Sequence, residues 1–174
     1  MDKNEMIEMK PGMIVYTSNT GHTERYAKML GDMTGLPVCE LCEAERRLTH
    51  HERVIYMGWL FASSVKGYAK ANKLFDIKAV VGVGLCPTGA LLDEVREAIK
   101  LPNSTPLFTV QGGMDYEKLR GINKFMIDML KRSLAKKRDR SKQEEATLEL
   151  LSSNADLVSP DNLESVVKWI ESEE

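Results

Sequence analysis

Hydroxyl, amide and imidazole side chains crowd one short stretch near the start of the chain, residues 17–23, which reads Thr-Ser-Asn-Thr-Gly-His-Thr. The apolar run 14–16 before it favours a strand, and from Thr23 onward apolar residues recur at helical spacing. The polar stretch is therefore expected at a helix N-terminus, where the free N–H groups of the first turn attract an anion such as a phosphate. Gly21 lets the backbone bend tightly there.

The same stretch contains no lysine. A loop that binds a nucleoside triphosphate supplies a cation and a magnesium-binding hydroxyl through its Gly-Lys-Ser/Thr pattern, whereas this loop offers mainly neutral donors. A group with one terminal phosphate suits such a loop better than ATP does. The alternative interpretation is an ordinary strand-turn-helix corner that is rich in hydroxyls.

Four more apolar runs follow, separated by helical or polar segments. Strands are predicted over 36–41, 53–58, 77–84 and 106–111, with helices over 23–33, 68–75 and 88–100. Residues 54–57 are continuously apolar, as a central strand buried on both faces requires. Five strand-helix units with short connections predict one parallel sheet that is covered by helices on both faces.

The loops after the first, third and fourth strands should meet at the carboxyl edge of that sheet, where open α/β folds bind ligands. These loops are residues 17–23, 58–64 and 84–88. The second loop carries Trp59 and Phe61, whose rings could wall a flat ligand or simply complete the core. The Gly-Val-Gly end of the fourth strand would let a ligand or backbone approach closely.

The first loop resembles the flavin mononucleotide (FMN) phosphate loop of the flavodoxin family. The matching positions are Ile14, Val15, Tyr16, Ser18, Gly21, Thr23, Ala27 and Leu30. The resemblance implies a three-layer α/β sandwich, with a five-stranded parallel sheet in the order 2-1-3-4-5 and a non-covalently bound FMN. It also implies a set of FMN-binding residues, namely Thr17, Ser18, Asn19, Thr20, Gly21, His22, Thr23, Trp59, Leu60, Phe61, Ala62, Gly84, Leu85 and Cys86.

His22 stands where a flavodoxin usually has Asn or another polar donor. A protonated imidazole at this position would add positive charge to the phosphate site. On this hypothesis, flavin affinity falls as the pH rises through neutrality.

About 60 residues follow the fifth strand, where a compact flavodoxin has one helix. Residues 118–140 carry apolar side chains at helical spacing, and nine Lys or Arg accompany only Asp128 and Asp139. This basic amphipathic helix is either a solvated face, balanced by the acidic segment 141–174, or a surface that contacts an anionic membrane. A last helix is predicted from Ser159-Pro160 onward, which makes 114–158 a helical insertion before it.

The segment 108–119, followed by 123–127 in the basic helix, looks like the branch of flavodoxin-domain proteins that includes the menaquinone-dependent protoporphyrinogen oxidase. Two functions follow from the resemblance. One is an electron-transfer protein that serves a redox partner through its flavin, and the other is a quinone-dependent enzyme of that kind at the membrane surface. No catalytic residue is identified. A receiver-type signalling domain is excluded, because Gly58-Trp59 and Thr17-Ser18 replace the acidic residues that it needs.

Composition limits the remaining choices. The chain of 174 residues is expected to form one domain with a lead-in over 1–10, and its net charge of −2 argues against general nucleic-acid binding. No apolar run reaches the ~18–20 residues of a membrane span, and the start lacks a signal-peptide core, which predicts a cytoplasmic protein. The three cysteines are expected as thiols. Without a second Cys or His pair nearby, Cys39 and Cys42 are not expected to bind a metal.

Overall fold

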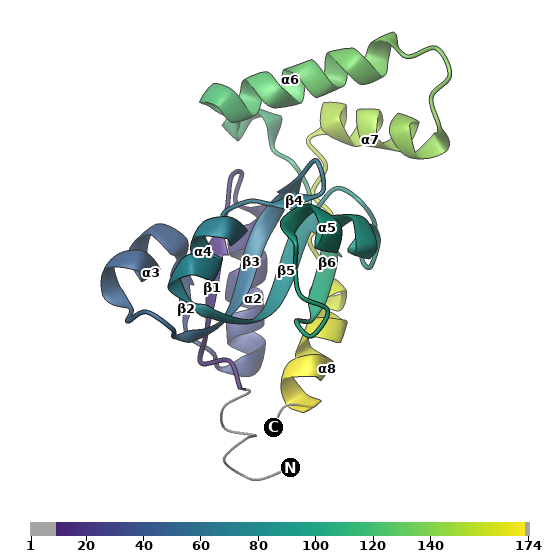
Figure 1. Ribbon diagram of the computed structural model, residues 1–174. Helices are drawn as coiled ribbons and strands as arrows, with labels where there is room; N and C mark the ends of the chain where they lie inside the picture. The colour runs from purple at the N-terminus through teal and green to yellow at the C-terminus, as the bar shows by residue number, and fades with distance from the viewer. Residues whose placement is uncertain (1–9, 173–174) are drawn as a thin grey trace.

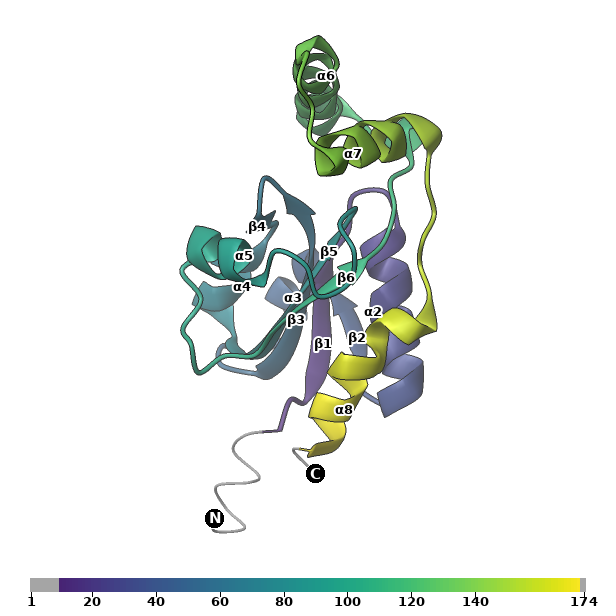
Figure 2. The same ribbon diagram turned by 90° about the vertical axis from the view of Figure 1, so that its right-hand side faces the viewer.

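The computed structural model describes residues 10–172 and shows a sheet between two layers of helices (Figures 1 and 2). The lead-in expected over 1–10 lies outside the described residues, apart from Lys10. Helices α2 (His22–Thr34) and α8 (Glu164–Ser172) pack on one face of the sheet. Helices α3 (Leu41–Arg47), α4 (Tyr68–Leu74) and α5 (Leu92–Ile99) pack on the other.

The main sheet is parallel, with its strands in the order β2-β1-β3-β5-β6. Its strands are β1 (Met13–Thr17), β2 (Val38–Glu40), β3 (Arg53–Phe61), β5 (Asp76–Gly84) and β6 (Leu107–Gln111). A short strand, β4 (Ser64–Val65), pairs antiparallel with β3 outside this path. Counted without β4, the order is 2-1-3-4-5, so the predicted flavodoxin-like fold class is confirmed.

The alternation of side chains along β1 shows how the sheet buries both faces. Ile14 packs toward α2 and α8, while its neighbour Val15 packs toward α3 and α4, and neither side chain is exposed. Both faces of the central strands must therefore be apolar, which explains the unbroken apolar runs in β3 and β5. Polar groups can therefore be placed at the strand ends. The polar loop follows the carboxyl end of β1.

The third strand continues beyond the predicted boundary at residue 58. Trp59, Leu60 and Phe61 favour extended backbone and extend β3, which then turns back into β4. Ala62 and Ser63 make the turn with positive φ angles of 48° and 60°, the conformation of a tight two-residue hairpin. The predicted aromatic loop is therefore a strand followed by a hairpin turn.

Two helices stand above the carboxyl edge of the sheet, α6 (Gly121–Lys136) and α7 (Lys142–Ser153) (Figures 1 and 2). With the short helix η1 (Tyr116–Lys118), they belong to residues 114–155, called the helical hairpin below. Its own small core consists of Met114, Leu119, Ile127 and Leu151. None of the helices in the described part of the chain is long and apolar enough to cross a membrane.

The hairpin joins the sheet through two closely spaced chain segments. The Met114 N–H donates to the Ala155 carbonyl at 3.0 Å, and the Leu157 N–H donates to the Gly112 carbonyl at 2.9 Å. Beyond this stem, the chain enters η2 (Pro160–Leu163) and α8. The Ser159 side chain accepts from the Asp161 N–H, as predicted for the start of the last helix.

The helix predicted over 88–100 begins later in the structure, and Thr88 does not cap it. Leu91 occupies the N-cap position, and α5 begins at Leu92. The Thr88 hydroxyl instead lies 2.7 Å from Asn162 Oδ1 and accepts from the Gln111 N–H at 3.0 Å. A partner 74 residues away along the chain overrides the local capping preference.

The fully buried Tyr26 connects α2, β6 and the segment before α8. Its hydroxyl donates to the Gln111 carbonyl and accepts from the Ser159 N–H at 3.2 Å and from Asn162 Nδ2 at 2.7 Å. We expect Tyr26→Phe to lower the free energy of unfolding by about 1–2 kcal/mol, because the Ser159 N–H loses its acceptor. For a chain of this length, that corresponds to a drop in melting temperature of roughly 2–8 °C.

Tyr68→Phe is the matched control, because Tyr68 is also buried and its hydroxyl has no hydrogen-bond partner among the described residues. Thermal unfolding of the two variants measures the difference. Equal melting temperatures for both would contradict the role assigned to the Tyr26 hydroxyl.

Candidate functional site

The polar loop lies between the end of β1 and the start of α2. Gly21 is the N-cap residue of α2 and has φ 96°, a conformation that favours glycine. Its N–H donates to Ser18 Oγ at 3.1 Å, which holds the loop closed on itself. The next N–H groups, in the first turn of α2, have no intrahelical carbonyl to reach, so the loop presents donors at the positive end of a helix.

His22 is buried at the base of this loop, with 8% of the residue exposed. Its Nδ1 lies 3.0 Å from Thr20 Oγ1, and its Nε2 lies 3.8 Å from Asp156 Oδ1. In a neutral ring that is protonated on Nε2, Nδ1 can accept from the Thr20 hydroxyl, while Asp156 is too far from Nε2 for a direct hydrogen bond. Asp156 is also paired with Arg25 at 2.6 Å.

Burial lowers the pKa of His22 below the ordinary histidine value, and the Arg25 guanidinium acts in the same direction. The Asp156 carboxylate raises the pKa but does not outweigh burial. The imidazole is therefore neutral at pH 7. This direction argues against the protonated imidazole that the sequence suggested for the phosphate site.

A small cavity of about 70 Å³ separates the loop from the helical hairpin. Its lining includes nine of the residues predicted from the sequence, namely Ser18, Asn19, Thr20, His22, Thr23, Trp59, Leu60, Gly84 and Leu85. The other lining residues were not predicted, and they are Val83, Gly113, Met114, Leu119 and Ile127. The first of these continues the apolar run of β5, but no sequence signal placed the hairpin residues here.

The other five predicted residues, Thr17, Gly21, Phe61, Ala62 and Cys86, do not line this cavity. The Thr17 hydroxyl is hydrogen-bonded to the Tyr56 hydroxyl at 2.9 Å. Phe61 packs on the core of the helical hairpin, and Ala62 forms the turn between β3 and β4. Cys86 lines a separate groove.

The glycines at the end of β5 have a different role from the one predicted. A Cβ atom on Gly82 or Gly84 would lie 3.0 Å from carbon atoms of the Leu60 side chain. The two glycines therefore make room for Leu60, which crosses over β5 from the neighbouring strand. Their small size serves packing within the protein.

The groove beside Cys86 has a volume of about 700 Å³ and runs between the loop after β5 and helix α7. Leu91 and Leu150 line it, and Leu85 contributes to both the groove and the small cavity. Burial raises the pKa of the Cys86 thiol, which makes it a weak nucleophile at neutral pH. Within the described residues, no three His, Cys, Asp or Glu side chains are grouped to hold a metal ion.

The polar end of the cavity suits the phosphate of FMN, but the cavity as a whole is too small for the cofactor. Ser18, Thr20, Thr23 and the N–H groups of α2 suit a single phosphate. Pockets for small molecules measure roughly 300–1,000 Å³, whereas this partly open cavity is about 70 Å³. Met114, Leu119 and Ile127 of the helical hairpin enclose it from above. A flavin ring could enter only if the hairpin moved away from the loop.

The parallel strand order and the polar loop after β1 define a flavodoxin-like α/β protein. No protein-family model and no curated protein matches the chain. Among solved structures, it is similar to the rubredoxin oxygen:oxidoreductase of the anaerobe Desulfovibrio gigas, with 13% sequence identity and a TM-score of 0.34. The alignment covers 97% of this chain and 39% of that protein, so the chain spans about two fifths of its length.

The lowered pKa of His22 predicts a pH-dependent stability. Because the unfolded chain binds a proton at His22 more readily than the folded protein does, stability falls as the pH drops through the ordinary histidine pKa of about 6.5. We expect His22→Asn, which keeps a polar atom near Thr20, to show a smaller decrease in the free energy of unfolding between about pH 7 and pH 5. Urea unfolding at several pH values measures it.

His50→Asn serves as the control, because His50 is exposed and belongs to neither the loop nor the cavity. It should leave the pH dependence as it is in the parent protein. If His22→Asn also leaves it unchanged, the buried neutral imidazole is refuted.

Proposed function

We propose that the protein binds FMN non-covalently and transfers electrons through it to a redox partner. The observation that carries this proposal is the position of the lysine-free polar loop. It follows β1, whose neighbours β2 and β3 lie on opposite sides of it. In open α/β sheets, the crevice at such a reversal of strand order is where ligands bind.

On this proposal, each part of the loop has a defined role. The hydroxyls of Ser18, Thr20 and Thr23, together with the first N–H groups of α2, hold the phosphate. Trp59 and Leu60 line the cavity and would pack against a flavin ring and shield it from water. FMN, once bound, supplies the redox chemistry, and the chain supplies binding, orientation and a dry environment.

The helical hairpin must shift for the ring to enter. Asn123 Nδ2 of α6 donates to Asn19 Oδ1 of the polar loop at 3.2 Å, which ties the hairpin to the loop. One neutral hydrogen bond contributes only about 0.5–1.5 kcal/mol, so flavin binding can readily offset its loss.

The test is a titration of the purified protein with FMN, followed by quenching of flavin fluorescence. We expect Ser18→Ala combined with Thr20→Val to weaken FMN binding at least about tenfold, because hydrogen bonds to a charged phosphate are lost. Riboflavin, which lacks the phosphate, is the matched control ligand, and its affinity should be the same for both proteins. Absence of FMN binding by the parent protein would refute the proposal.

A second candidate is favoured by the groove that adjoins the cavity at Leu85. A volume of about 700 Å³ beside a bound flavin would accommodate a substrate of the protein itself. The corresponding function is a quinone-dependent oxidoreductase similar to the menaquinone-dependent protoporphyrinogen oxidase. Lys142 at the edge of the groove would attract an anionic substrate.

Ala146→Trp fills this groove from α7, at a position outside the small cavity. If the enzyme function is correct, the FMN-loaded parent protein oxidises protoporphyrinogen with a quinone acceptor. The variant should then lose at least about tenfold in kcat/KM, the equivalent of about 1.4 kcal/mol, while FMN affinity stays unchanged. No oxidation by the parent protein leaves the electron-transfer function in place and rejects the enzyme function.

A further inference from the structure

Helix α6 has apolar side chains on two opposite faces. On the inner face, Ile127 is buried, and Leu130 and Leu134 pack on the core of the helical hairpin. On the outer face, Ile122, Phe125 and Met129 are 68%, 61% and 58% exposed. Every other exposed large apolar side chain in the described part of the chain is less than half exposed, so the outer face of α6 stands apart.

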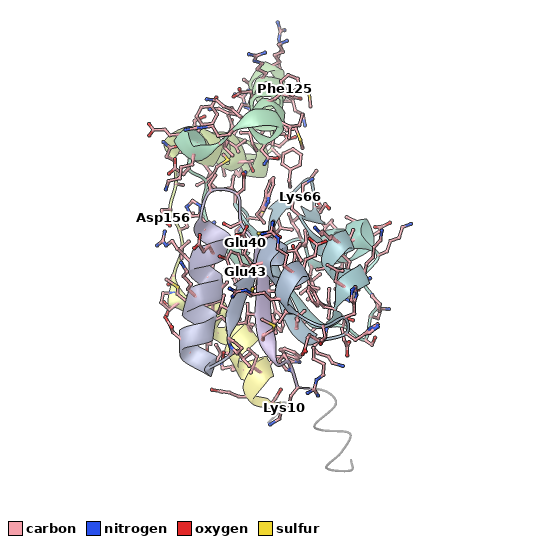
Figure 3. All side chains as sticks on the ribbon, turned by 90° about the vertical axis from the view of Figure 1, so that its left-hand side faces the viewer. Lys10, Glu40, Glu43, Lys66, Phe125 and Asp156 are labelled. Atoms are coloured by element: carbon pink, nitrogen blue, oxygen red, sulfur yellow. The ribbon has the colours of Figure 1, made fainter. Side chains whose placement is uncertain are left out.

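The three exposed side chains form one ridge. Their spacing of three and four residues places them on the same side of the helix. Figure 3 shows Phe125 near one end of the molecule and Lys10 near the opposite end. Nothing else in the described residues covers this ridge, which we call the α6 ridge.

Cations continue the α6 ridge toward the end of the helix. Arg132 and Lys136 lie three and seven residues beyond Met129, on the same side, and both are exposed. Among the described residues, no carboxylate lies within 4.0 Å of either side chain. The carboxylate of Asp128, on the same helix, instead accepts a hydrogen bond from the Tyr116 hydroxyl at 2.5 Å.

We propose that the α6 ridge docks on an anionic phospholipid membrane, with Phe125 among the acyl chains and Arg132 and Lys136 at the headgroups. A helix with an apolar stripe and adjacent cations lies in the plane of the membrane interface, held by apolar burial and by attraction to anionic lipids. Each cation near such a surface contributes about 1 kcal/mol. The ridge needs no flavin, so this docking is independent of the proposed FMN site.

A second copy of the chain suits this ridge less well. An antiparallel or parallel pairing through α6 would bring several cations of both copies into one interface, and like charges there oppose association. A standard protein interface also uses about 20–30 residues on each side, many more than the three side chains of the ridge. A lipid surface accepts a narrow ridge, because the acyl chains rearrange around single side chains.

The test is co-sedimentation of the 174-residue chain, without added flavin, with vesicles. Vesicles of phosphatidylcholine and phosphatidylglycerol should bind the protein at low salt, whereas vesicles of phosphatidylcholine alone should bind it at least about tenfold more weakly. Phe125→Ser should reduce binding to the anionic vesicles, and Met33→Ser, which removes an exposed methionine from α2, should not. Arg132→Gln and Lys136→Gln should each weaken binding about fivefold, the equivalent of about 1 kcal/mol.

Phe125→Trp gives a second readout that does not depend on loss of binding. It should retain vesicle binding and show a blue shift of tryptophan emission that anionic vesicles do not induce in the parent protein. Equal binding to both vesicle types, no binding to either, or full binding by Phe125→Ser would overturn the proposal. So would a dimer in analytical ultracentrifugation that Phe125→Ser dissociates, since the ridge would then belong to a second copy.

Discussion

The position of the helical hairpin depends on one tight contact between its stem and the first turn of α2. A Cβ atom on Gly113 would lie 2.1 Å from the Ala155 carbonyl oxygen and 2.8 Å from His22 Nε2, so no larger residue fits without displacement. The same contact buries the imidazole and thereby lowers the pKa of His22. The stem therefore passes the buried imidazole at a distance that leaves no room for a side chain at residue 113.

The sheet, the loop after β1 and the helical hairpin have three different roles around this contact. The doubly covered sheet provides a rigid frame, because its central strands are apolar on both faces and leave polar groups only at their ends. The loop after β1 places hydroxyls and free N–H groups at one such end. The helical hairpin then adds apolar side chains over that loop, which makes the small cavity polar on one side and apolar on the other.

Local patterns in the sequence were sufficient to predict the sheet and the helices that cover it. The apolar runs at 14–16 and 54–57 lie within β1 and β3, and the strand predicted over 77–84 lies within β5. The helix predicted over 23–33 lies within α2. The glycines of β5 illustrate what a local pattern cannot reveal. They precede a loop and suggest room for a ligand, yet the space above them holds Leu60 from another strand.

For a related reason, the sequence did not reveal which residues of the helical hairpin cover the cavity. Met114, Leu119 and Ile127 lie in segments whose patterns did not indicate a cavity, and they reach the loop because the chain leaves the sheet after β6 and folds back over it. The hydrogen bond between Asn19 and Asn123 spans 104 residues of sequence, so neither amide signals its partner. Periodicity could identify α6 as a helix, but the tertiary contacts decide which of its two apolar faces points inward.

The stem of the helical hairpin also bears on how the fold could change. Gly113 and Asp156 pair as an isolated antiparallel bridge, so the chain leaves the sheet and returns to it at adjacent points. A tight turn could therefore replace residues 114–155 without stretching the remaining backbone, since closing such a short loop needs little entropy. Insertion or excision at this point is the kind of rearrangement by which a chain can gain or lose a whole accessory module while keeping its core intact.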